Sequence, residues 1–336
     1  MIKRVPGLIL ILLLLAHLIA LGLGAGFVYR EVFGARTIPA EFRDYQVREG
    51  AALNDVIADL HERDLAPNPF PVRLAIALKG EPILIKKGRY LLPERASTWE
   101  ILTLFDSGKV ELTKVTLPEG LDKWQVAELL GKQQWGTQAE FAAVIEDPST
   151  ITAIDPEAQD LEGYLFPETY FFPQEATPEE IVHTMVRQFI EQTESLRHQL
   201  AGRDLTIREW VALASMVEKE TSLDEERALI AGVFQNRLDK RMLLQCDPTI
   251  IYSLKRENLY KGKIYRSQIR YDSAYNTYVY PGLPPGPIAS PGLASLEAAL
   301  APQETEYIFF VAKKDGSHHF SRTLREHNRA VNRYQR

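Results

Sequence analysis

The chain is poor in cysteine and has no excess of basic charge. The first shortage excludes an internal disulfide, and the second excludes one class of partner. Its one cysteine, Cys246, allows no disulfide within the chain, so its stability must come from packing. Its 45 acidic residues outnumber its 39 basic residues, and the formal net charge is -6. Proteins that bind nucleic acid usually carry a basic domain or a basic stripe. The composition therefore excludes nucleic acid as a partner.

Charge is also missing from one long stretch near the amino terminus. The run from Val5 to Tyr29 contains no charged residue, and as a helix it would rise roughly 35 Å against a hydrocarbon core of ~30 Å. A cleaved signal peptide has a shorter apolar core, so the run favours an uncleaved anchor, although "GLGAG" leaves cleavage open. Lys3 and Arg4 precede the run, which predicts a cytoplasmic stub and an anchor over 1–30, with the body exported across the cell membrane.

Beyond the anchor, the pattern predicts an α+β chain in two parts. A tether and a small α/β subdomain would occupy 31–114, and a mixed α+β domain would occupy 115–336. The segments "VREGAALNDVIADL" (47–60) and "LPEGLDKWQVAELL" (117–130) each place a Glu-Gly turn before an apolar helical pattern. They predict strand, turn and helix twice, either as a duplicated unit or as two common turns.

Capping signals predict where several helices begin. Ser97 with Glu100, Thr177 with Glu180, and Thr323 with Glu326 have the spacing of capping boxes. A further helix is predicted from about Thr206 to Thr221. Asp315-Gly316 predicts a hairpin between two strands, and the Gly/Pro-rich segment "GLPPGPIASPG" (282–292) predicts a stiff surface loop. This irregular alternation argues against a doubly wound sheet.

One carboxylate stands out within "ASMVEKETS" (214–222). On a helix, Val211, Ala214, Ser215 and Glu218 share one face, because they fall at i, i+3, i+4 and i+7. An acid that projects from such a small, apolar surface suits proton donation to a substrate. The alternative is a solvated surface glutamate, or one paired with Lys219 or Arg227.

Other residue groups leave several readings open. The tyrosines and amide of "YNTYVY" (275–280) and "EGYLF" (162–166) are typical of carbohydrate grooves, but also of ordinary β core. Cys246 with His318 or His319 resembles a nucleophile pair, although no protease signature surrounds it. His318, His319 and His327 match no standard zinc spacing. No motif therefore predicts a metal or an organic cofactor.

Six motifs together resemble a known family. They are "LEGYLFPETY", "LASMVEKET", "ERALIAGVFQNRL", "LQCDPTIIYSL", "YNTYVYPGLPPGPIASPG" and "YIFFVAKKDGSHHFSRTLREHN". In this order they closely resemble the YceG-like family of endolytic murein transglycosylases, the MltG type, and the likeness runs from about residue 45 to the carboxy terminus. The resemblance implies a LysM-like membrane-proximal part and a catalytic domain.

The resemblance also implies a reaction and its site. The substrate would be the peptidoglycan glycan strand, cut at the β-1,4 bond between N-acetylmuramic acid and N-acetylglucosamine with a 1,6-anhydro end as product. The catalytic acid falls on Glu218, which would donate a proton and then accept one. The same motifs imply groove or support residues, which are Glu162, Gln245, Asp247, Tyr252, Tyr275, Asn276 and Tyr278.

Some details of this assignment have alternatives. Asp247 also reads as a helix cap, and Glu162 as the structural partner of an arginine. At Ser290 the sequence departs from the family, in which an Asn is expected. Cutting within strands and trimming new strands beside wall synthases also rest on the resemblance.

Two rival functions remain open at this stage. One is a membrane-tethered scaffold that binds peptidoglycan without cutting it. The other is a muramidase that hydrolyses the same bond with water, using Glu218 together with Asp247 or Glu162. This second rival requires another carboxylate within about 5–10 Å of Glu218.

Overall fold

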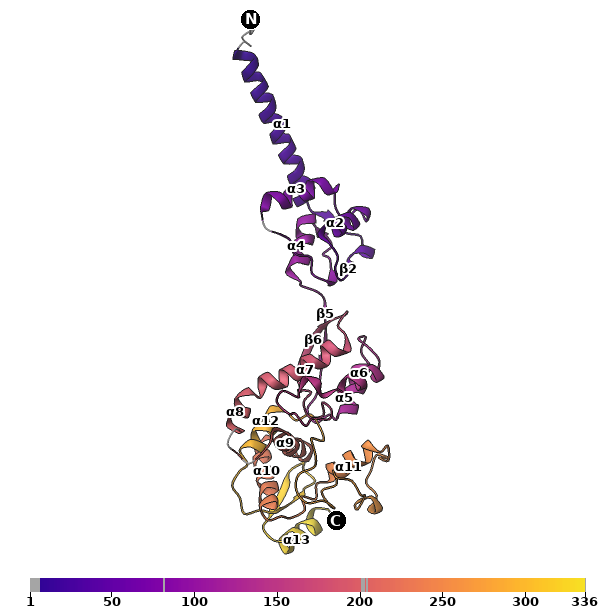
Figure 1. Cartoon of the computed structure of the whole chain (residues 1–336), viewed down its shortest axis with the longest axis vertical. Coiled ribbons are helices and arrows are strands. Elements are labelled where there is room, and N and C mark those ends of the chain that lie inside the picture. The colour runs from indigo at the N-terminus through magenta and orange to yellow at the C-terminus, as the bar shows by residue number, and fades with distance from the viewer. Residues whose placement is uncertain (1–6, 81, 201–202, 204, 336) are drawn as a thin grey trace. The chain divides into compact units, whose positions relative to one another are not determined.

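The structure is a computed structural model that describes residues 7–80, 82–200, 203 and 205–335. The chain divides into two compact units, with Phe171–Glu175 belonging to the first. Unit 1 is Met1–Thr113 with this segment, and unit 2 is Lys114–Tyr170 with Ala176–Arg336. Each unit combines helices with short strands (Figure 1), which confirms the α+β prediction.

Unit 1 contains the apolar helix and the small subdomain. Its elements are α1 (Gly7–Phe33), β1 (Arg36–Thr37), η1 (Ala40–Phe42), β2 (Asp44–Val47), α2 (Leu53–Glu62), α3 (Pro69–Lys79), β3 (Gly88–Leu91), β4 (Arg95–Ala96) and α4 (Thr98–Ser107). The β2, α2, α3 and β3 elements form a βααβ unit, in which β2 pairs antiparallel with β3 and Tyr45 lies opposite Tyr90.

The predicted anchor corresponds to α1. Its segment Ile9–Phe33 has a mean hydropathy of 2.5 and is long and apolar enough to cross a membrane. Residues 1–6, which include the predicted cytoplasmic stub, lie outside the described residues. The last turn of α1 is part of the folded subdomain, because Val32 is fully buried and the ring of Phe33 lies 5.1 Å from that of Trp99. Since β1 then pairs with β4, the segment after α1 is folded where a tether was expected.

Unit 2 is larger and mostly helical. The elements from the unit boundary onward are β5 (Leu112–Thr116), α5 (Lys123–Gly131), α6 (Gln138–Ile145), η2 (Pro148–Thr150), β6 (Thr169–Pro173), α7 (Pro178–Gln192), α8 (Glu194–Leu200), α9 (Ile207–Glu220), α10 (Asp224–Asp239), α11 (Asp247–Arg256), η3 (Arg266–Gln268), α12 (Leu293–Leu300), β7 (Phe309–Ala312), β8 (His318–Ser321) and α13 (Leu324–Tyr334).

Helix α9 lies at the centre of unit 2, beside α10 and α12 (Figure 1). All of its residues from Trp210 to Val217 are buried, and the indole of Trp210 donates a hydrogen bond to the carbonyl of Leu296 in α12 (2.9 Å). A helix buried on every side is held by packing rather than by its own propensity. The carboxy-terminal end of α9 is therefore a rigid base for the side chains that follow Val217.

Most predicted local signals are confirmed. Capping boxes at Ser97, Thr177 and Thr323 open α4, α7 and α13. Both Glu-Gly turns connect a strand to a helix, and the Asp315-Gly316 turn joins the antiparallel strands β7 and β8.

Two local predictions are wrong. The 282–292 segment is irregular, as expected, but its residues 286–292 are buried rather than on the surface. They run against α9, where their main-chain groups find partners in neighbouring segments. Asp247 does not cap α11, because the N-cap is Cys246 and the carboxylate of Asp247 instead accepts a hydrogen bond from Tyr278 (2.7 Å).

Candidate active site

Glu218 lies in the last turn of α9 and is half-buried. Its Oε2 atom accepts two hydrogen bonds, from the main-chain N–H of Gly292 (3.1 Å) and from the hydroxyl of Ser295 (2.7 Å). Both donors stand at the start of α12, where the helix dipole is positive. Within the described part of the chain, Oε1 makes no hydrogen bond. One oxygen is thus fixed in place, while the other has no hydrogen-bond partner among the described residues.

The buried 286–292 segment brings α12 to Glu218. Its Ile288 N–H donates to the hydroxyl of Ser215 (3.0 Å) on α9. Its Ser290 exchanges two main-chain hydrogen bonds with the turn before α5, to Gly120 and Leu121, both 2.8 Å. The Ser290 hydroxyl is buried and lacks a hydrogen-bond partner among the described residues. The main chain therefore makes these bonds whatever side chain stands at position 290.

A second carboxylate, from Glu119, lies beside Glu218. A Cβ placed on Gly120 would lie 3.6 Å from Cγ of Glu218, and a Cβ placed on Gly292 would overlap the carboxyl group of Glu119. Burial, and then the nearby charge of Glu218, raise the pKa of Glu119, while Arg227 opposes the rise. Two carboxylates from segments that are distant in the sequence therefore both lie next to Gly292, which has no side chain to separate them.

Sequence reasoning missed Glu119, although the Glu-Gly turn that carries it was noticed. The turn needs a glycine at positive φ, and Gly120 has a φ of 74°. The first copy of the pattern has the same turn, but there Glu49 is exposed and pairs with Lys87 (3.3 Å). The pattern alone therefore does not distinguish a site residue from a surface residue.

The two cations that could have neutralised Glu218 are bound elsewhere. The ammonium of Lys219 donates to the carbonyl of Gly120 (2.8 Å). The buried guanidinium of Arg227 pairs with Asp224 and donates to the hydroxyl of Ser295 (3.1 Å). Arg227 is therefore linked to Glu218 through Ser295, whose hydroxyl accepts from Arg227 and donates to Glu218, and it also pairs with Glu119 (3.9 Å).

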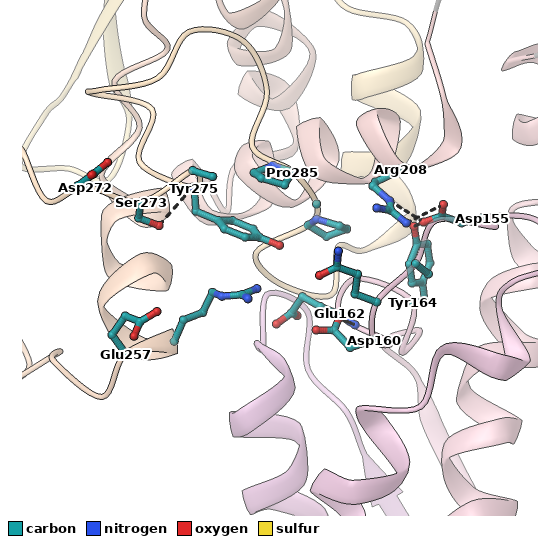
Figure 2. Close-up of a pocket in the computed structure, with 16 residues that line it drawn as sticks. Asp155, Asp160, Glu162, Tyr164, Arg208, Glu257, Asp272, Ser273, Tyr275 and Pro285 are labelled. Carbon is teal, nitrogen blue, oxygen red and sulfur yellow. Dashed lines mark hydrogen bonds and ion pairs between the residues drawn. The ribbon is translucent and has the colours of Figure 1, made fainter.

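Glu162 lies in a different place, a cavity of about 390 Å³ (Figure 2). Its Oε2 accepts the main-chain N–H of Lys123 (3.1 Å), and burial raises its pKa to about 8. Among the described residues no arginine forms an ion pair with Glu162, and Arg208, which lines the same cavity, pairs with Asp155 (3.0 Å; Figure 2).

A cluster of aromatic rings includes Tyr275, which lines the same cavity as Glu162. Tyr252 is buried between Trp124 and Tyr275, with ring centroids 5.2 Å and 4.9 Å away. Tyr275 lines the cavity, and the guanidinium of Arg256 lies 4.9 Å from its ring centroid. The ring of Tyr275 and the carboxyl group of Glu162 give the cavity an aromatic and a hydrogen-bonding group, and Tyr252 and Trp124 pack behind Tyr275.

Three of the remaining predicted residues lie together at a third place. Gln245, Asp247 and Tyr278 line a cavity of about 380 Å³ together with residues of β7, β8 and α13. Asn276 is instead fully buried, and its amide donates to the carbonyls of Ile269 and Tyr271. It supports the loop that carries the tyrosines.

The three places are separated along α9. Gly163, next to Glu162, packs against Val211, and Glu218 lies seven residues further, which is about 10 Å along the helix. The third place is the cavity that Glu220 lines. The Glu220 carboxylate accepts a hydrogen bond from the thiol of Cys246 (3.1 Å). Residues two apart on a helix face different directions. Glu162 and Asp247 thus line the other two cavities, and Glu119 is the carboxylate that lies beside Glu218 in the described contacts.

Cys246 itself is poorly suited to be a nucleophile. Burial and the adjacent Glu220 raise the pKa of its thiol well above the usual range. A thiolate is the reactive form, so this environment opposes the Cys/His reading.

The sequence pattern of the YceG-like family matches residues 45–333. A relative in Bacillus subtilis named endolytic murein transglycosylase is 30% identical over 86% of this chain and 83% of its own. A Streptococcus pneumoniae relative of the same name is 28% identical, over 94% of this chain and 63% of its own. A crystal structure of a YceG-like protein from Listeria monocytogenes matches with a TM-score of 0.60 and 30% identity, covering 89% of this chain and 99% of that one. The chain therefore belongs to the YceG-like family.

Proposed function

We propose that this chain is a membrane-anchored lytic transglycosylase that cuts peptidoglycan glycan strands internally, leaving 1,6-anhydro-N-acetylmuramic acid ends. The observation that carries the proposal is the environment of Glu218, whose Oε2 is held by Gly292 and Ser295 while no described residue forms a hydrogen bond with Oε1. The names of the relatives supply the substrate class.

The reaction needs one acid used twice. Glu218 donates its proton from Oε1 to the glycosidic oxygen, and the bond from the muramyl anomeric carbon to that oxygen breaks. The muramyl C6 hydroxyl attacks the same carbon, and its proton passes to the carboxylate of Glu218. The acid is regenerated and no water is consumed. General acid–base catalysis of this kind contributes typically about 10²–10⁴-fold.

Glu119 favours a second candidate function, the muramidase. Hydrolysis needs a second carboxylate that activates water or attacks the sugar. Glu119 is the carboxylate that lies beside Glu218. In this version Glu119 replaces the two carboxylates expected from the sequence. Its product would carry a reducing end.

The test is digestion of purified peptidoglycan by the full chain in detergent, wild type against Glu218→Gln, with products resolved by mass spectrometry. We expect anhydro ends from the wild type and none from the variant, because the amide cannot donate a catalytic proton. Reducing ends would replace the proposal with the muramidase. Intact glycan, with binding retained by both proteins, would support the scaffold.

We further propose that α1 spans the inner membrane once, with a cytoplasmic amino terminus, and that cutting trims or ends nascent strands beside synthases. Lys3 and Arg4 before the apolar run support this orientation. Protease added to intact spheroplasts should remove unit 2, and loss of the gene should lengthen glycan strands. Protection of unit 2 would overturn the orientation, and unchanged strand length would overturn the trimming role.

A further inference from the structure

The outward face of α3 in unit 1 is apolar. Phe70, Leu74 and Leu78 fall at i, i+4 and i+8 and are 68%, 36% and 77% exposed. The opposite face is apolar too, since Val72 and Ala75 are buried in the core of the unit. A helix on a water-exposed surface normally places polar residues on its outward side. An apolar stripe on that side indicates a partner.

The stripe adjoins the apolar surface of α1. A hollow of about 760 Å³ lies between the two helices, and its lining includes Leu21, Phe27 and Val28 from α1 and the three stripe residues from α3. Most large apolar side chains of α1 are themselves exposed, such as Leu21 at 65% and Phe27 at 58%. Because the end of α1 belongs to the core of unit 1, the two helices form one continuous apolar surface, and Figure 1 shows α3 beside that end of α1.

The depth of the stripe follows from the length of α1. A hydrocarbon core of ~30 Å accommodates about 20 helical residues. Counted from Ile9, these end near Val28, so the part of α1 that lines the hollow, between Ala20 and Phe33, spans one leaflet and the interface beyond it.

The side chains around the hollow are those of a membrane interface. Tyr29, Phe33 and Trp99 form a row of rings, with centroids 5.2 Å and 5.1 Å apart. The ammonium of Lys79 lies 5.4 Å from the Trp99 ring centroid, and Arg73 of α3 is exposed beside the stripe. Aromatic rings and long basic side chains that extend toward head groups mark this depth of a bilayer.

We propose that α3 lies in the membrane interface, with Phe70, Leu74 and Leu78 inserted among the acyl chains of the leaflet that faces unit 1. The partner of this surface is the lipid bilayer itself. Unit 1 is then held by two adjacent helices, one spanning and one lying in the interface. The proposal rests on α1 spanning the membrane and is independent of the proposed catalytic reaction.

The test places an environment-sensitive nitrobenzoxadiazole probe on a cysteine introduced at the stripe, Leu78→Cys, in the full chain reconstituted into phosphatidylcholine–phosphatidylglycerol vesicles. The matched control is Glu49→Cys, whose side chain is 83% exposed and belongs to the same unit. The wild-type chain gives the labelling blank, because Cys246 is buried. Circular dichroism checks that both variants fold.

The expected result is a shift of the position-78 emission to shorter wavelength, together with quenching by doxyl groups on lipid acyl chains, and neither effect at position 49. Emission at position 78 that matches position 49 would overturn the proposal. A shifted but unquenched emission would also overturn it, since it would show a protein, such as a second copy of this chain, covering the stripe.

Discussion

Glu162 and Glu119 both have raised pKa values, but their surroundings differ. Glu162 is buried, with 3% of its surface exposed, and it accepts a hydrogen bond from the main chain of Lys123. Glu119 has a side chain that is 49% exposed and stands beside the charge of Glu218. Ionisation of Glu162 therefore mainly lowers the free energy of unfolding, whereas ionisation of Glu119 changes the charge beside Glu218.

The first prediction concerns Glu162 and pH. Since its folded pKa of about 8 lies above the usual value of 4.5, its contribution to stability is complete below the unfolded pKa and is lost as pH rises through 8. A full shift of this size corresponds to on the order of 5 kcal/mol. Glu162→Gln should leave the free energy of unfolding nearly unchanged at pH 5 and raise it above pH 8, as measured by urea titration. Equal pH slopes in the two proteins would contradict this.

The second prediction concerns Glu119. If Glu218 alone carries the protons, Glu119→Gln should still yield anhydro ends, with a rate within about tenfold of wild type and one ionisation removed from the pH profile of kcat/KM. If Glu119 activates water, the same change should cost about 10²–10⁴-fold. Glu49→Gln is the matched control, because it alters the equivalent turn of unit 1 and should change neither rate nor profile.

At the scale of elements, the 286–292 segment decides where the site is built. It packs between α9 and the turn before α5, and its Pro287 lies against Gly163. A Cβ on Gly163 would overlap the ring of Pro287 and reach 3.0 Å from Val211, and its φ is 82°. The packing of the 286–292 segment therefore requires a residue without a side chain at position 163.

The third prediction follows from this crossing. Gly163→Ala should destabilise unit 2 by roughly 2–4 kcal/mol, from overpacking together with backbone strain. Gly282→Ala is the control: its φ is 88°, but nothing lies within 4 Å of the added methyl group. It should therefore cost only the strain, about 1 kcal/mol. Thermal melts of both variants give the comparison, and equal losses would show that the close approach does not matter.

The same segment shows what the sequence could and could not predict. Capping boxes at Thr177 and Thr323 involve residues three apart, so the sequence alone placed those helices. The burial of 286–292 depends on hydrogen bonds to Ser215 and Gly120, which are distant in the sequence. Gly and Pro forbid a helix there but do not indicate whether the loop is covered. Glu119 was missed for the same reason, because its meeting with Glu218 arises only in the fold.

At the scale of the whole molecule, the anchor is part of a folded unit. Val32 in the last turn of α1 is 0% exposed and packs in the core of unit 1 with residues such as Ile38 and Leu102. Anchors joined by flexible linkers would tolerate changes at that point. Here the helix end and the subdomain should unfold together.

The last prediction tests this coupling. Val32→Ala should lower the stability of unit 1 by roughly 1–3 kcal/mol, because it removes buried methyl groups from a packed core. Leu23→Ala on the same helix should leave it unchanged, since Leu23 is 72% exposed and contributes to no core. Hydrogen exchange in detergent follows each unit separately, and unit 2 should be unaffected in both variants. If the two substitutions act alike on unit 1, α1 is an anchor and nothing more; if only Val32→Ala acts, the spanning helix is an integral part of the fold.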